Sequence, residues 1–123
     1  METKLDRMTI NGVTYVPEGT QSALAQNEDG LDYVIIRASE AGVFAGYLET
    51  DDDEIVVLKN CRRLWYWSGA ASCSDLARKG VSNPKECKFC APVAEIKIMN
   101  VIENIKATDA AKKSIEGVTI WQA

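Results

Sequence analysis

The chain has 123 residues, 46% of them hydrophobic, and a formal net charge of −4 at pH 7. This length suits a single domain over residues 1–123 with one hydrophobic core, and it excludes a second domain of ordinary size. Histidine is absent, which excludes Ser-His-Asp triads, Cys-His pairs and metal sites that use imidazole.

No apolar run approaches the roughly 20 residues that cross a bilayer, and the first residues lack the apolar stretch of a signal peptide. We therefore expect a cytoplasmic protein with no membrane partner. Charge is unevenly distributed, because residues 1–60 carry twelve acidic and four basic side chains whereas residues 61–123 carry six acidic and ten basic. Such asymmetry fits self-association, a nucleic-acid footprint on the basic half, or solvated loops with no partner.

The N-terminal quarter predicts a flexible start, a hairpin and a loop. Residues 1–7 are expected to be flexible. Residues 8–16 place Asn11-Gly12 between short alternating β-formers, and this dipeptide favours the type I′ turn of a β-hairpin. Residues 17–31 are polar and rich in turn-forming residues, which predicts a loop.

Three β-rich runs then predict an antiparallel meander. They cover residues 33–38, 43–49 and 55–60, and the last run continues or restarts through 61–67. Runs of this length joined by short turns favour antiparallel neighbours. The acidic run at residues 51–54 lacks the ligand spacing of a calcium loop, so we expect a solvated turn there.

The C-terminal half predicts two short helices and two more strands. Ser72 or Ser74 can cap a helix that Gly80 ends, and Thr108 can cap a second helix that Gly117 ends. Residues 81–92 are expected to form a loop, residues 94–106 one long strand with a bulge near Asn100, and residues 118–121 a final strand. The predicted fold is α+β, a mostly antiparallel sheet of five to seven strands with an N-terminal hairpin and two short helices.

The run "CRRLWYW" at residues 61–67 carries two arginines and three large aromatic residues. In a strand, Arg62, Leu64 and Tyr66 share one face and Arg63, Trp65 and Trp67 share the other. One interpretation is that a tryptophan face fills the core while arginine stems lie along its rim.

The same run also fits two kinds of binding. Arginine and tryptophan are enriched in protein interfaces, and aromatic residues interleaved with basic ones can stack nucleotide bases. The negative net charge weakens the interpretation as a nucleotide or nucleic-acid site, because phosphate contacts favour a basic surface. The candidate interface, for self-association or for a protein partner, is Arg62, Arg63, Trp65, Tyr66 and Trp67.

Four cysteines raise the question of a metal site. Cys87 and Cys90 form a C-x-x-C pair, and Cys61 and Cys73 could in principle complete a four-thiolate zinc site. Zinc fingers usually offer two close pairs, whereas Cys61 and Cys73 lie twelve positions apart. We therefore expect reduced, partly buried thiols, with no metal and no other cofactor.

Several stretches together resemble a known family: "INGVTYVP", "YVIIRASEAGVFAGYL", "VVLKNCRRLWYWSGAASCSDLARKGV" and "AAKKSIEGVTIW". They are similar to short proteins of tailed bacteriophages and prophages that are catalogued as a domain of unknown function. The similarity spans about residues 9 to 121 and brings no catalytic residues with it. It implies a place in the cytoplasm of an infected bacterium, with association with the virion left open.

These observations predict a protein that is not an enzyme. The first hypothesis is a small phage-type accessory protein that self-associates or docks on a phage or host protein. The alternative is a phage inhibitor of a host defence system, which would mimic nucleic acid, block an effector or bind a nucleotide signal.

Overall fold

The computed structural model describes residues 8–10, 13–15 and 24–122. Strands β1 (Met8–Ile10) and β2 (Val13–Tyr15) pair antiparallel, which confirms the predicted N-terminal hairpin. Residues 1–7 and 17–23, for which flexibility and a loop are predicted, lie outside the described residues. Residues 24–31 form a turn and isolated bridges, as expected of a loop.

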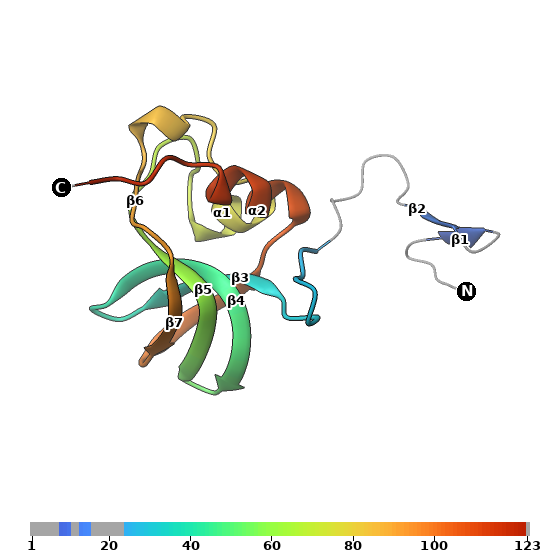
Figure 1. Ribbon diagram of the computed structural model, residues 1–123, viewed down its shortest axis with the longest axis horizontal. Helices are drawn as coiled ribbons and strands as arrows, with labels where there is room; N and C mark the ends of the chain where they lie inside the picture. Colours follow the sequence, from blue (N-terminus) through green and yellow to red (C-terminus); the bar gives the residue numbers. More distant parts are fainter. Residues whose placement is uncertain (1–7, 11–12, 16–23, 123) are drawn as a thin grey trace.

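The main sheet is an antiparallel meander extended on both sides. Strands β3 (Tyr33–Ala38), β4 (Gly42–Asp52) and β5 (Ile55–Tyr66) are neighbours in order. Strand β8 (Val101–Lys106) pairs with β3, and strands β6 (Lys88–Phe89) and β7 (Val93–Ile98) both pair with β5. With the two helices described below, this arrangement confirms the predicted α+β fold (Figure 1).

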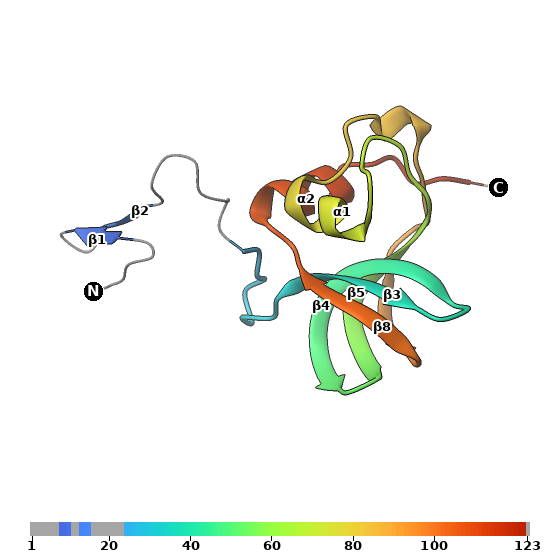
Figure 2. The ribbon, with the colours of Figure 1, turned by 180° about the vertical axis from the view of Figure 1, so that it is seen from behind.

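The prediction of one long strand over residues 94–106 is wrong. Met99 and Asn100 form a turn instead of a bulge, with Asn100 in the left-handed region at φ 61°, a conformation that asparagine tolerates better than most residues. The turn sends β7 and β8 to opposite edges of the sheet. Two residues can join opposite edges only if the sheet curls, and Figure 2 shows β4 and β5 curving around the interior toward β8.

Two other predictions for the C-terminal half need correction. Residues 81–92 are not simply a loop, because they contain the 3₁₀ turn η1 (Pro84–Glu86) and the short strand β6. Residues 118–121 form no regular strand, only a parallel bridge between Ile120 and Phe89. The Val118 carbonyl accepts a hydrogen bond from the Arg62 side chain and not from a neighbouring strand. Residues 118–121 therefore form no regular ladder of backbone hydrogen bonds with another strand.

The curled sheet has a core on each face. Successive side chains of a strand point to opposite faces, and in β3 Tyr33 and Ile35 face one core while Val34 and Ile36 face the other. The inner core fills the curl, and the outer core lies beneath helices α1 (Cys73–Lys79) and α2 (Asp109–Glu116). Both helices cover the same side of the sheet (Figures 1 and 2).

Side-chain caps begin both helices. Ser72, rather than Ser74, caps α1 by accepting a hydrogen bond from the Asp75 amide at 3.2 Å, and the Asp75 carboxylate accepts one from the Ala71 amide at 3.0 Å. Thr108 caps α2 by accepting a hydrogen bond from the Ala111 amide at 3.1 Å. Such caps satisfy amide groups that have no partner inside the helix.

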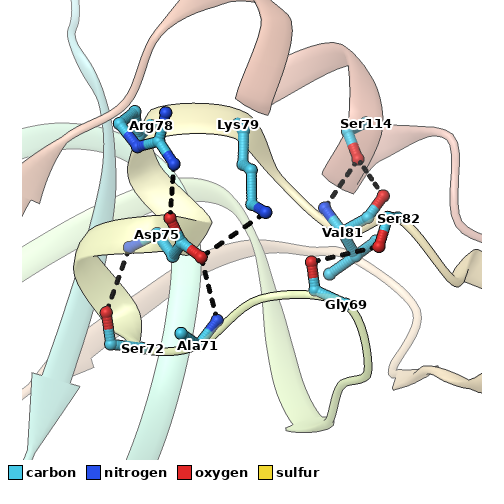
Figure 3. Close-up of polar contacts among 9 residues, drawn as sticks. All are labelled: Gly69, Ala71, Ser72, Asp75, Arg78, Lys79, Val81, Ser82 and Ser114. Atoms are coloured by element: carbon cyan, nitrogen blue, oxygen red, sulfur yellow. Dashed lines mark hydrogen bonds and ion pairs between the residues drawn. The ribbon is translucent and has the colours of Figure 1, made fainter.

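The helices are also tied to each other. The Ser114 hydroxyl of α2 accepts a hydrogen bond from the Val81 amide at 3.0 Å and donates to the Val81 carbonyl at 3.2 Å (Figure 3). Gly80 precedes Val81 with φ 78°, and a Cβ atom there would lie 2.4 Å from Ser114. Glycine therefore allows the close approach of the two helices as well as the left-handed end of α1.

Candidate functional site

A β-bulge in β5 sets the direction of the side chains that follow it. Asn60 and Cys61 together lie opposite Gly46 of β4, and Asn60 takes the left-handed conformation at φ 48°. A Cβ atom on Gly46 would lie 3.0 Å from the Cys61 Cα, so the strands can approach only because Gly46 has no side chain. The extra residue shifts the alternation of side chains along β5. Leu58 faces the inner core before the bulge, and Cys61 faces it after the bulge.

The bulge turns Arg62 toward the helices, where its side chain is buried. Arg62 is 3% exposed. Its Nε donates to the Cys90 carbonyl at 2.9 Å, its Nη1 donates to the Ile115 and Val118 carbonyls at 2.9 Å each, and its Nη2 donates to the Phe89 carbonyl at 3.2 Å. Arg62 thus joins β5, β6 and the end of α2 from inside the molecule, instead of lying on an accessible surface.

Arg62 stays charged although its surroundings, mainly through burial, lower its pKa overall. Burial lowers the pKa of its guanidinium, whereas nearby Tyr33, Cys90 and Glu116 raise it. Because the ordinary arginine pKa lies above about 12, the group stays protonated at neutral pH and can donate all four hydrogen bonds. Its positive charge also lies at the carbonyl end of α2, which favours a cation.

Arg63 points to the opposite face of β5. Its guanidinium carbon lies 4.5 Å from the centroid of the Phe44 ring, and its Nη1 donates to the Ala41 carbonyl at 2.6 Å. No carboxylate among the described residues lies within ion-pair distance of Arg63. The ring and the carbonyl therefore hold the Arg63 side chain in place, and no acidic partner from the described part of the chain neutralises its charge.

Arg63 lines two neighbouring hollows in the surface. The smaller, of about 170 Å³, is bounded by Arg63, Trp65 and Trp67 together with residues 41–43, where the turn after β3 leads into β4. The larger, of about 310 Å³, is bounded by Arg63 together with residues 39–41 and 96–100. The predicted face of Arg63, Trp65 and Trp67 is therefore brought together around one hollow.

The tryptophans do not fill the core as one interpretation expected. Trp65 is 64% exposed and Tyr66, on the other face of the strand end, is 52% exposed. Trp67 lies beyond the end of β5 and packs partly against the outer core. Of the two neighbouring arginines, Arg62 is the buried one. Of the three aromatic residues that follow, Trp65 is the most exposed.

Sequence reasoning missed residues 41–43, at the junction of the turn and β4, and the Phe44 ring as parts of this site. The turn contributes through its backbone, since the Ala41 carbonyl accepts from Arg63 and Gly42 has φ 107°. The glycine in "SEAG" indicates a turn, but nothing in that pattern indicates that the turn lies against residues 63–67. Only the pairing of β4 with β5 brings them together.

The four cysteines are free thiols in different surroundings. Cys61 is fully buried in the inner core, and burial raises the pKa of its thiol to about 12. Cys73 begins α1 and its pKa is also raised, mainly by burial. The Cys87 sulfur accepts a hydrogen bond from the Ser68 amide at 3.5 Å, and Cys90 is half-buried. In the part of the chain that the structure describes, no three Cys, Asp or Glu side chains are grouped so that they could hold a metal ion.

Comparison with known proteins places the chain in one family. Residues 31–115 match the family described as a domain of unknown function (DUF6948). The match covers more than half of the chain and includes β3 through most of α2, so the chain belongs to this family. No curated protein and no solved structure shows significant similarity to it. None of the described helices is long and apolar enough to cross a membrane.

Proposed function

We propose that this member of the DUF6948 family is a non-enzymatic accessory protein that binds another protein through a docking face. The docking face consists of Arg63, Trp65 and Trp67 with residues 41–43, at the junction of the turn and β4. The resemblance to short phage and prophage proteins supports a phage or host protein as the partner and the cytoplasm of an infected bacterium as the place.

The proposal is carried by one observation, the position of Arg63 beside the exposed Trp65 at the edge of a hollow. Trp65 is 64% exposed, so it offers a large apolar surface to a partner. Arg63 is held by Phe44 and Ala41 without an acidic partner among the described residues. Tryptophan and arginine are the residue types most enriched where binding energy is concentrated. We expect the partner to place an apolar side chain in the hollow and a carboxylate near Arg63.

The composition of the two hollows favours binding over catalysis. Of the residues that the structure describes, Arg63 is the only charged one that lines the smaller hollow, and Glu40 is the only carboxylate that lines the larger one. General acid-base chemistry by carboxylates usually uses a pair of them. The single cation of the smaller hollow also suits a protein carboxylate better than a nucleic-acid backbone, whose binding uses several cations along successive phosphates; Lys97 adds a second cation only at the larger hollow.

Affinity purification of matched variants tests the proposal. Tagged wild type, Trp65→Ala, Arg63→Glu and Lys85→Glu would be expressed in a bacterial host, and the recovered proteins quantified by mass spectrometry. Lys85 is an exposed residue of η1 that lies outside the docking face, so its charge reversal is the control. We expect one dominant protein with wild type and Lys85→Glu and its loss with Trp65→Ala and Arg63→Glu.

Calorimetry with that protein in purified form would follow. We expect Trp65→Ala to weaken binding by about 2 kcal/mol or more, as at interface hot spots. Equal recovery of the same protein by all four variants would contradict the proposal. So would tight, salt-dependent binding of single-stranded DNA that is lost in Trp65→Ala, because the face would then be a nucleic-acid site.

A further inference from the structure

Strand β7 has a free edge. Residues Val93–Ile98 pair with β5 on one side, and among the described residues no strand pairs with the other side. Figure 1 shows β7 beside β5 as an outer strand of the curled sheet. A strand edge presents unpaired N–H and C=O groups, which can pair with a strand of another molecule.

The side chains of β7 carry opposite charges on one face. Ile96 and Ile98 face the inner core, so Glu95 and Lys97 point outward. The Glu95 carboxylate accepts a hydrogen bond from Lys59 of β5 at 2.6 Å, whereas Lys97 has no ion pair among the described residues. The outward face of β7 therefore presents one acidic and one basic residue, two positions apart.

We propose that two copies of this chain associate by antiparallel pairing of their β7 strands about a twofold axis at Ile96. In this register Glu95 of each copy lies opposite Lys97 of the other, which gives two cross-strand pairs of opposite charge. Val93 of each copy then lies opposite Met99 of the other. These residues are 44% and 57% exposed and are two of the large hydrophobic side chains left open to solvent in the described chain.

The charges select this register over its neighbours. The twofold axis keeps the outward side chains of both strands on the same face of the sheet only when it passes beside the same residue of each strand. The neighbouring registers therefore place the axis at Glu95 or at Lys97. With the axis at Glu95, the two Glu95 side chains would be opposite each other, and with the axis at Lys97, the two Lys97 side chains would be. Like charges directly opposite are destabilising. The charges of β7 therefore favour pairing with a second copy of β7 in the register centred on Ile96. This charge complementarity is why we propose a second copy of the chain as the partner.

Charge reversal tests the proposal directly. Sedimentation velocity over a range of concentrations would compare wild type, Glu95→Lys, Lys97→Glu, the double variant E95K/K97E and the control Lys85→Glu. The interface is small, so we expect a concentration-dependent equilibrium between monomer and dimer in wild type and Lys85→Glu. Each single reversal places like charges opposite each other twice and should weaken the dimer at least about tenfold.

Two combinations should restore the dimer. The double variant again places opposite charges across the axis, and an equimolar mixture of Glu95→Lys with Lys97→Glu does so between unlike chains, which native mass spectrometry would detect as a heterodimer. Rescue by these combinations would show that the single reversals act at the interface between chains, and not through loss of the Lys59–Glu95 ion pair within one chain. Trp65→Ala should leave the dimer unchanged, because Trp65 lines only the smaller hollow, whereas β7 borders the larger one; failure of one proposal therefore leaves the other standing.

Hydrogen exchange gives a second readout. The amides of residues 93–99 should become more protected as the wild-type concentration rises, and should not in Lys97→Glu. The proposal is overturned if wild type stays monomeric at several hundred micromolar, or if both single reversals dimerise as well as wild type. It is also overturned if these amides gain protection only when a different protein is added.

Discussion

Arg62 and Arg63 are neighbours in the sequence, yet their guanidinium groups lie on opposite faces of β5. Arg62 is 3% exposed and donates to four backbone carbonyls, whereas Arg63 stacks on Phe44 at the edge of an open hollow. The first arginine therefore serves the stability of the fold, and we assign the second to the docking face. This division gives adjacent residues opposite expected responses to substitution.

Substitution of each arginine by lysine should separate the two roles. Lysine keeps the charge but cannot reach all four carbonyls that Arg62 satisfies, and buried carbonyls left without donors are costly. We expect Arg62→Lys to lower the free energy of unfolding in urea by about 3 kcal/mol and Arg63→Lys to lower it by less than about 1 kcal/mol. Equal losses in both variants would show that the two side chains contribute alike to stability.

Two glycines with the same φ angle provide a test of the helix contact. Gly80 and Gly30 both have φ 78°, but a Cβ atom on Gly80 would lie 2.4 Å from Ser114 whereas one on Gly30 would meet nothing within 4 Å. Gly30→Ala should cost about 1 kcal/mol for the left-handed conformation alone. Gly80→Ala should cost about 2 kcal/mol more, since overpacking against Ser114 adds to the strain and the ψ of −147° at Gly80 is one that other residues with positive φ rarely adopt. Chemical denaturation of both variants measures the difference, and similar costs would mean that the helices can move apart freely.

Much of the fold could be predicted because its signals are local. Strand β3 spans residues 33–38 as expected from its β-branched and aromatic residues, and Thr108 caps α2 as predicted. The division of residues 94–106 into β7 and β8 could not be predicted, because Met99 and Asn100 lack the glycine or proline that usually indicates a turn. That division depends on each half pairing with a different, distant strand.

The candidate site could be predicted only in part, for a similar reason. Alternation correctly separates Arg62 from Arg63, because it depends only on the extended backbone. Which face is buried depends on carbonyl groups at residues 89–90 and 115–118, which are remote in the sequence. Aromatic character alone suggested that the tryptophans fill the core, whereas Leu64 and Phe89 already fill the space beneath the helices.

The thiols should differ widely in reactivity. Burial raises the pKa of Cys61 to about 12 and leaves none of its surface accessible, so very little thiolate is present at pH 8. Cys90 is the least buried of the four. With a chromogenic disulfide reagent at pH 8, we expect one fast reaction that Cys90→Ser abolishes and no reaction of Cys61 until the protein unfolds. Rapid labelling of Cys61 in the folded protein would contradict its place in the inner core.

Acid should remove the contribution of Asp75 to stability. The Ala71 amide, followed by the Arg78 side chain, lowers the pKa of the Asp75 carboxyl below its ordinary value (Figure 3). A lowered pKa stabilises the folded state above the ordinary carboxyl value of about 4, and the stabilisation is lost as the pH falls through the lowered value. Wild type should therefore melt at a higher temperature than Asp75→Asn at pH 7, and the gap should close near pH 2. A gap that is constant or grows in acid would contradict this assignment.

Photocrosslinking from position 65 tests the docking face most directly. A photoreactive phenylalanine analogue would replace Trp65 in one protein and the exposed Lys85 in another, and crosslinked products would be compared after irradiation in living bacteria. We predict one dominant crosslinked protein from position 65, absent from position 85 and lost when Arg63→Glu is added. The same products from both positions, or a position-65 product that survives Arg63→Glu, would contradict the assignment of this face to a specific protein partner.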